Sequence, residues 1–279
     1  PPQSSGWRAG RCGVVDKWSK LGVKGWRLDV VDELPIDFTD KLCARIRSEG
    51  DDMLVVGEVW EDASVKIAYS EWRPYFMGEQ LDSVMNYPFK EAILAYVLNG
   101  DKNAFIADIT AVLEHYPKQS LDVLMNLVGS HDTARAITVL SGIKPPYSKK
   151  DRADFTLSCE QYDLAKRRLK VANALQYTLP GVPCVFYGDE AGKQGFEDPL
   201  NRGTYPWGRE DTDLIEHYRA LGKIREKYKD LLQGETHFVK DSDKLIFERV
   251  CTDGVLRVES QGLWLSISVN GKVVMSINK

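Results

Sequence analysis

The feature that most constrains the fold is an alternation of short apolar runs with helical segments along most of the chain. The apolar runs are strand-sized, and the helical pattern over 160–179 is the clearest, with an apolar stripe at helical spacing. Repeated strand–helix units predict a parallel sheet with helical crossovers. We expect strands at 26–30, 53–58, 81–86, 123–128 and 182–187, helices at 37–48, 88–98, 103–114, 132–140, 160–179 and 211–232, and loops at 141–158 and 188–210.

Polar residues gather at the C-terminal ends of these predicted strands, where barrels of the TIM (β/α)8 type carry their active sites. The predicted fold class is therefore α/β, with five strand–helix units of such a barrel. After Gly234 the pattern changes to five short strands with turns such as Asp253-Gly254 and Asn270-Gly271. We expect an α/β domain over 1–234 and a small antiparallel β domain over 235–279.

Composition excludes several classes of function. The 279 residues include 37 Lys+Arg and 41 Asp+Glu, and this mild acidity disfavours a nucleic-acid binder. No apolar run approaches the roughly 20 residues of a membrane helix. The five cysteines are scattered without a Cys-x-x-Cys pair, which indicates reduced thiols and disfavours a zinc site. These features favour a cytoplasmic protein, with secretion left open.

Three acidic residues lie at the ends of predicted strands. Asp29 ends the first strand, Glu58 ends the second, and Asp132 follows the fourth. Each has a simpler reading: Asp29 could pair with Arg27, Glu58 could be a solvated strand end, and Asp132 could cap the following helix. His131 alone is more often a packed histidine than a catalytic one. The joint occurrence of three acids on loops of one barrel favours a shared site.

Glycoside hydrolysis is the chemistry that uses such a set. A retaining glycosidase needs one ionised carboxylate as nucleophile and one carboxylic acid as proton donor. Arg27 lies two residues before Asp29 and therefore points to the same face of the strand, where its guanidinium would keep Asp29 ionised. Glu58 lies between an apolar strand and Trp60, which favours its protonated form.

Three segments carry a family resemblance. Residues 25–30 (GWRLDV), 57–60 (GEVW) and 130–133 (SHDT) resemble, in the same order, the active-site segments of the α-amylase family of glycoside hydrolases. The resemblance implies that Asp29 is the nucleophile, Glu58 the general acid/base and Asp132 the stabiliser of the transition state. It also implies that Arg27 contacts the nucleophile and that His131 contacts the sugar in subsite −1.

Further segments are similar to one branch of that family, which contains neopullulanase, cyclomaltodextrinase and maltogenic amylase. They are 57–63, 80–89 and 187–190 with 198–202. The resemblance implies that Asp198 and Arg202 bind sugar at subsite −2, although a turn and a loop salt bridge are alternatives. Trp60 and Trp207 could stack on sugar rings or belong to the core. The tail resembles the C-terminal β domain of the family.

The chain also departs from the family pattern. The likeness begins at the helix before the fourth barrel strand, so we expect strands 4–8 only, and 1–13 is a poor helix. We therefore expect a fragment with impaired activity and an exposed sheet edge that needs a partner, either a second copy in a homodimer or the missing N-terminal half. We predict no cofactor. Calcium stays an option that we do not predict, because some ligands of the family would lie in absent segments.

The expected function is hydrolysis of α-glucans such as cyclodextrin, pullulan and maltooligosaccharides at α-1,4 bonds, with α-1,6 bonds left open. One alternative is an oligo-1,6-glucosidase-type enzyme, although Thr133 follows the His-Asp pair where such enzymes usually carry another residue. A second is a catalytically silent family member that acts as a binding or transporter-associated subunit. Such members generally lose acidic residues, and all three are present here.

Overall fold

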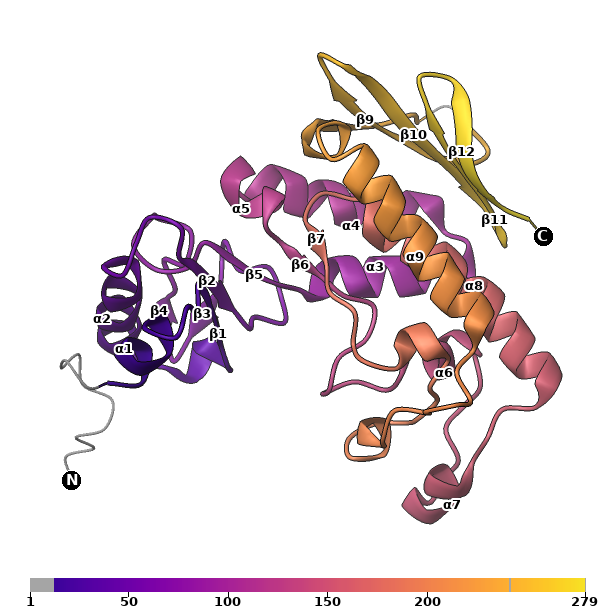
Figure 1. Ribbon diagram of the computed structural model, residues 1–279, viewed down its shortest axis with the longest axis horizontal. Helices are drawn as coiled ribbons and strands as arrows, with labels where there is room; N and C mark the ends of the chain where they lie inside the picture. Colours follow the sequence, from indigo (N-terminus) through magenta and orange to yellow (C-terminus); the bar gives the residue numbers. More distant parts are fainter. Residues whose placement is uncertain (1–12, 241, 279) are drawn as a thin grey trace. The chain divides into compact units, whose positions relative to one another are not determined.

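The computed structural model describes residues 13–240 and 242–278 and divides into two compact units (Figure 1). The first contains the chain up to Pro88 together with Val112–Met125, and the second contains Phe89–Ala111 and the chain from Asn126 onward. The prediction for 1–12 lies outside the described residues. The two units are considered separately below.

Three parallel strands form the centre of the first unit. They are β1 (Gly25–Leu28), β2 (Leu54–Gly57) and β5 (Ser83–Asn86), with β2 in the middle. Val55, Val56 and Val84 are buried, as expected for a parallel sheet whose strands are covered on both faces. The helices of this unit are α1 (Val14–Ser19), α2 (Ile36–Arg47) and α5 (Lys118–Asp122).

A small hairpin, which the sequence patterns did not indicate, follows β2. It consists of β3 (Ile67–Ala68) and β4 (Glu71–Trp72), paired antiparallel. Each strand has two residues, too short for a period-two pattern to be recognised.

Two further strands complete the order β1-β2-β5-β6-β7, which is the order along the chain. These are β6 (Met125–Asn126) and β7 (Val182–Pro183), and both are shorter than the predicted 123–128 and 182–187. Helices α3 (Tyr87–Asn99) and α4 (Lys102–His115) match their predicted positions. The expected α/β class with a parallel sheet is confirmed.

The second unit contains the longest helix, α8 (Cys159–Thr178). Ser158 and Gln161 form a capping box at its start, and its second half is buried from Val171 onward. Figure 1 shows α9 (Thr212–Lys227) lying beside α8, and the two helices are in contact. The aromatic rings of Tyr177 and Tyr218 pack edge to face across this contact.

Two sequence predictions in this unit were wrong. The helix predicted over 132–140 begins only at Ala136, as α6 (Ala136–Leu140), and its N-cap is Arg135. Asp132 is therefore not a helix cap. The loop predicted over 141–158 contains a short helix, α7 (Lys149–Asp154), capped by the Ser148 side chain.

The tail is a five-stranded antiparallel sheet in the order β12-β11-β10-β9-β8, as expected. Arg249 is buried at its junction with the helices, where it donates hydrogen bonds to the carbonyls of Thr178 (3.0 Å), Gly234 (3.0 Å) and Leu232. The domain boundary at 234 stays a prediction. The strands are β8 (Glu235–Phe238), β9 (Leu245–Cys251), β10 (Gly254–Gln261), β11 (Trp264–Val269) and β12 (Lys272–Ile277).

No helix in the described part of the chain has the length and apolar character needed to cross a membrane.

Candidate active site

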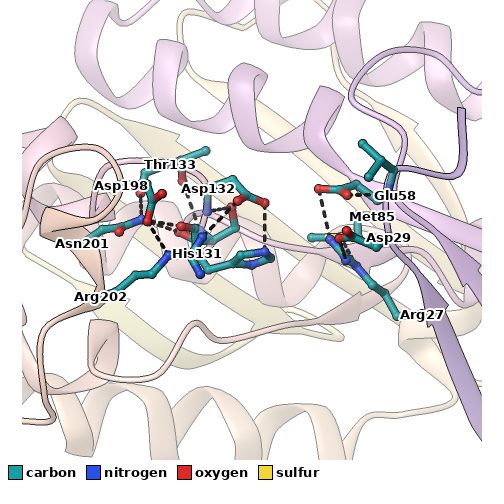
Figure 2. Close-up of polar contacts among 12 residues, drawn as sticks. Arg27, Asp29, Glu58, Met85, His131, Asp132, Thr133, Asp198, Asn201 and Arg202 are labelled. Atoms are coloured by element: carbon teal, nitrogen blue, oxygen red, sulfur yellow. Dashed lines mark hydrogen bonds and ion pairs between the residues drawn. The ribbon is translucent and has the colours of Figure 1, made fainter. Parts of the chain in front are cut away.

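In the first unit, Arg27 is the centre of a group of polar side chains (Figure 2). Its Nη1 atom pairs with Oδ1 of Asp29, and its Nη2 atom lies 3.0 Å from Oε1 of Glu58. Its Nε atom donates to the sulfur of Met85 at 3.3 Å. The guanidinium therefore lies between two carboxylates, which follow different strands of the sheet.

The parallel pairing of β1 and β2 explains why these two carboxylates meet. Leu28 is opposite Gly57 in the register, and the amide of Glu58 donates to the carbonyl of Leu28 at 3.0 Å. Asp29 and Glu58 therefore leave their strands at the same end of the sheet. A Cβ atom at Gly57 would lie 2.4 Å from Cδ1 of Leu81, so this side chain would have to shift for any larger residue there.

Val30 holds the second carboxylate through its backbone. Its amide donates to Oε2 of Glu58 at 2.8 Å, and its φ of 39° is in the left-handed region. That conformation is unfavourable for a β-branched residue, and strain of this kind gathers at functional sites. The two acids differ in environment, because the side chain of Asp29 is 72% exposed and that of Glu58 is 3% exposed.

The sequence-based prediction for Arg27 was therefore correct for Asp29 and incomplete for Glu58. The apolar surroundings expected for Glu58 are not found: its carboxylate is buried, but it contacts the Arg27 guanidinium and the Val30 amide. Trp60, two residues later, stacks on Tyr87 with ring centroids 4.2 Å apart and planes 10° apart. One face of the Trp60 ring is thus covered by protein, while the residue remains 44% exposed.

In the second unit, Asp132 is the centre of another group (Figure 2). Its Oδ2 atom lies 3.0 Å from Nε2 of His131, and its Oδ1 atom lies 3.4 Å from Nη2 of Arg202. Arg202 also pairs with Asp198, at 2.5 Å through Nε. The four residues predicted from the sequence in this unit are thus in contact as a chain of polar side chains. Trp207 is largely exposed and packs against Tyr205.

The loop that carries Asp132 is held by Asn201, which sequence reasoning missed. The Nδ2 atom of this buried asparagine donates to the carbonyls of His131 and Thr133, both at 2.7 Å. Within the loop, Ser130 donates its amide to the Thr133 hydroxyl at 3.1 Å. The backbone on both sides of Asp132 is therefore anchored. Nothing in the local sequence around Asn201 signals this role, because its partners lie about seventy residues earlier.

Asn201 is supported in turn by a buried ion pair between Arg135 and Asp189. The Nε atom of Arg135 donates to the Asn201 carbonyl at 2.8 Å, and Nη1 lies 3.1 Å from Oδ1 of Asp189. The guanidinium also lies 3.9 Å from the ring centroid of Phe186. Burial raises the pKa of Asp189 to about 7, although Arg135 opposes the shift.

The residues predicted to be functional therefore fall into two groups. Arg27, Asp29, Glu58 and Trp60 lie in the first unit, and Arg27 joins the first three. His131, Asp132, Asp198 and Arg202 lie in the second unit and contact one another. Among the residues that the structure describes, no group of three or more His, Cys, Asp or Glu side chains could hold a metal ion.

Comparison with known proteins identifies the family. Residues 7–243 match the catalytic domain of alpha amylase, and the chain belongs to the alpha-amylase family. The match covers both groups of polar residues described above. The family predicted from the sequence is therefore confirmed.

The relatives include members of the predicted branch. An amylopullulanase of Thermoanaerobacter thermohydrosulfuricus is 37% identical, over 77% of this chain and 14% of the relative. Neopullulanase 2 of Thermoactinomyces vulgaris is 33% identical, over 92% of this chain and 41% of the relative. A cyclomaltodextrinase of a Bacillus species is 32% identical, over 85% of this chain and 38% of the relative.

Solved structures agree with this assignment. A cyclomaltodextrinase has a TM-score of 0.71 and 30% identity, over 88% of this chain and 38% of that chain. The cyclic α-maltosyl-(1→6)-maltose hydrolase of Arthrobacter globiformis has a TM-score of 0.73 and 25% identity, over 88% of this chain and 50% of that chain. The chain spans half or less of the length of each of these relatives.

Proposed function

We propose that this chain carries the acid pair of a retaining glycoside hydrolase that acts on α-glucans. The observation that carries the proposal is the position of Arg27, whose two terminal nitrogens contact Asp29 and Glu58. One guanidinium can contact both carboxylates only if they are close together. A short separation suits a retaining enzyme, because an inverting enzyme leaves room for a water molecule between them.

The proposed reaction is a double displacement. Glu58 protonates the glycosidic oxygen while a carboxylate oxygen of Asp29 attacks the anomeric carbon, and the bond to the leaving group breaks. Glu58 then removes a proton from water, the water oxygen bonds to the anomeric carbon, and the ester to Asp29 is released. The exposure of Asp29 leaves it accessible to a sugar. Asp132 stabilises the positive charge that develops on the sugar ring.

The proposed substrates are α-glucan oligosaccharides, including cyclodextrins, maltooligosaccharides and pullulan. The names of the relatives support this class, since they include a cyclomaltodextrinase, a neopullulanase and an amylopullulanase. The hydrolase of Arthrobacter globiformis is named for a cyclic maltosyl-maltose with an α-(1→6) linkage, which supports α-1,6 bonds as a second target. Asp198 and Arg202 are proposed to bind a further sugar unit, as their ion pair presents both hydrogen-bond acceptors and donors.

The test is hydrolysis of β-cyclodextrin and maltoheptaose by the chain and its Glu58→Gln variant. We expect the substitution to lower kcat at least about a hundredfold, as removal of a general acid does. Glu216→Gln is the matched control, because it makes the same chemical change at a glutamate that is largely exposed on α9. Proton NMR of the first product should show the α anomer. Unchanged turnover by Glu58→Gln, or initial release of the β anomer, would refute the acid/base role or the retaining mechanism.

Association with a second chain also stays a prediction. A sheet edge that is not covered favours pairing with another strand. Size-exclusion chromatography with light scattering tests it, and a monomer at all concentrations up to 100 µM, roughly where weak association would be visible, would contradict a homodimer.

A further inference from the structure

The hairpin that follows β2 displays several apolar side chains to solvent. Tyr69 is 70% exposed and Trp72 is 50% exposed. Val65, Ile67 and Met77 nearby are more than half exposed as well. We call Tyr69, Trp72 and Ile67 together the aromatic hairpin. Exposed apolar residues that gather on one short element mark a binding surface more often than scattered ones do.

The turn of this hairpin places a tyrosine in an unfavourable conformation. Ala68 pairs with Glu71, so the turn has only two residues, and their φ angles are 54° at Tyr69 and 64° at Ser70. Both central residues of such a turn need positive φ, which favours Asn and Gly. A bulky residue in the left-handed region loses roughly 1–2 kcal/mol.

The polar ends of both rings are bonded within the protein, and at least half of each residue stays exposed to solvent. The hydroxyl of Tyr69 donates to Glu33, and Nε1 of Trp72 donates to the carbonyl of Ser64 at 3.4 Å. Ile67 and Trp72 are direct cross-strand partners, so their side chains lie on the same face of the hairpin. These bonds restrict the rotamers of the two rings, which lowers the entropy lost when a ligand stacks on them.

The hairpin is anchored to the segment that follows Asp29. Lys66 lies 3.0 Å from Asp32, and Tyr75 donates to the same carboxylate at 2.6 Å. The buried Arg73 donates to the carbonyls of Asp32 and Leu34, both at 3.0 Å. The aromatic hairpin is therefore fixed to the segment that begins three residues after the proposed nucleophile.

We propose that the aromatic hairpin is a binding surface for the pyranose rings of an α-glucan chain, beyond the sugars that occupy the proposed catalytic site. The proposal rests on the proposed function for the identity of the ligand. A pyranose ring presents an apolar face of C–H groups and an edge of hydroxyls. Exposed aromatic side chains suit the first, and the carboxylates of Glu61 and Glu71 beside the hairpin accept hydrogen bonds from the second. The acidic side chains disfavour an anionic ligand such as a nucleic acid or an anionic membrane.

The test compares long and short substrates. Tyr69→Gly and Trp72→Ala are introduced singly and together, and binding of soluble starch is measured by affinity gel electrophoresis. Hydrolysis of maltotriose is measured in parallel. We expect the double variant to bind starch at least about tenfold more weakly, because two stacking contacts are lost. Turnover of maltotriose should stay within about twofold of the parent.

Two controls keep folding separate from binding. Tyr69→Gly removes the ring but relieves the positive φ, so the turn should form at least as readily as in the parent. Trp18→Ala removes a tryptophan that is 47% exposed on α1, away from the hairpin in sequence, and should leave starch binding unchanged. Circular dichroism confirms that each variant is folded.

Each remaining outcome is decisive. Starch affinity that is equal in the double variant and in Trp18→Ala would overturn the proposal. A change in oligomeric state with unchanged starch affinity would also overturn it, and would assign the hairpin to a contact between copies of the chain. Loss of starch binding without turnover of any glucan by the parent would support the binding surface while refuting the proposed catalytic function. If turnover depends on Glu58 but the hairpin variants bind starch as strongly as the parent does, the catalytic function is supported and the binding surface is refuted.

Discussion

Replacing Asp189 with asparagine isolates the energetic effect of one buried carboxyl group. In the folded protein its side chain is 1% exposed, lies 3.1 Å from Arg135 and has a second oxygen without a hydrogen-bond partner. Asparagine has nearly the same shape and keeps an acceptor for Arg135. The variant therefore resembles the parent with Asp189 protonated, and the two should differ only where the carboxyl group would ionise.

The size of the effect follows from the pKa. Burial raises the pKa of Asp189 from 3.8 to about 7 in the folded protein. The folded state therefore holds the proton more tightly than the unfolded state does. The resulting stabilisation is fully present below pH 3.8 and is lost as the pH rises to about 7. Three pH units at about 1.4 kcal/mol each correspond to about 4 kcal/mol in total, of which about 3 kcal/mol falls between pH 5 and pH 8.

The assay is urea unfolding of parent and variant at pH 5, 6, 7 and 8, followed by circular dichroism. We expect the variant to gain about 3 kcal/mol relative to the parent across this range. Asp37→Asn is the control, because Asp37 lies exposed on α2 and its curve should run parallel to the parent. Parallel curves for Asp189→Asn would refute the raised pKa. A variant that is about 3–5 kcal/mol less stable at pH 8 would show that attraction to Arg135 outweighs burial.

Three further substitutions test single interactions: a set of buried hydrogen bonds, a close contact at a glycine and a helix cap. Arg249→Met leaves three backbone carbonyls without their buried donor, and calorimetry should show a loss of about 3 kcal/mol, or roughly 6–12 °C in Tm. Gly129→Ala places a Cβ atom 2.6 Å from Oδ2 of Asp189, and urea unfolding should show about 1–3 kcal/mol of destabilisation. Ser158→Ala removes the capping box of α8, and the same measurement should show a loss of about 1 kcal/mol.

Each of these has a result that would contradict it. An unchanged Tm for Arg249→Met would mean that water reaches the freed carbonyls. A Gly129→Ala variant as stable as the parent would mean that Asp189 can move aside at little energetic cost. Ser158→Thr keeps the capping hydroxyl and is the control for Ser158→Ala, so equal losses in the two would rule out capping as the cause.

The sequence alone was sufficient to predict the features that depend on residues close together in the chain. Alternation of apolar runs with helical patterns predicted the five strands of the parallel sheet and the helices α2, α3, α4, α8 and α9. Strand parity predicted that Arg27 and Asp29 share a face, and the structure pairs them. Turn residues and short alternating runs predicted the antiparallel sheet of the tail. In each case a residue and its partners are close in sequence or follow a fixed period.

The loop that carries Asp132 shows where local rules fail. The residues after it have helical propensity, but helix α6 begins only at Ala136. A helix over 132–140 would need the carbonyls of this segment as internal acceptors. Asn201 binds one of them, that of Thr133, and also the carbonyl of His131 just before the segment, from about seventy residues away. No pattern around Asp132 contains that information, because the competing donor lies in another segment.

The sequence by itself determined the class of fold, the family and the acidic residues at the ends of the strands, because these depend on periodicity and on short motifs. Apart from the neighbouring Arg27 and Asp29, tertiary structure decided which groups surround those acids. It turned the amide of Val30 toward Glu58, set Arg27 between two carboxylates and buried Asp189 beside Arg135. The physical reason is that charge and hydrogen-bond environments are set by distances between segments. Those distances exist only after the chain has folded.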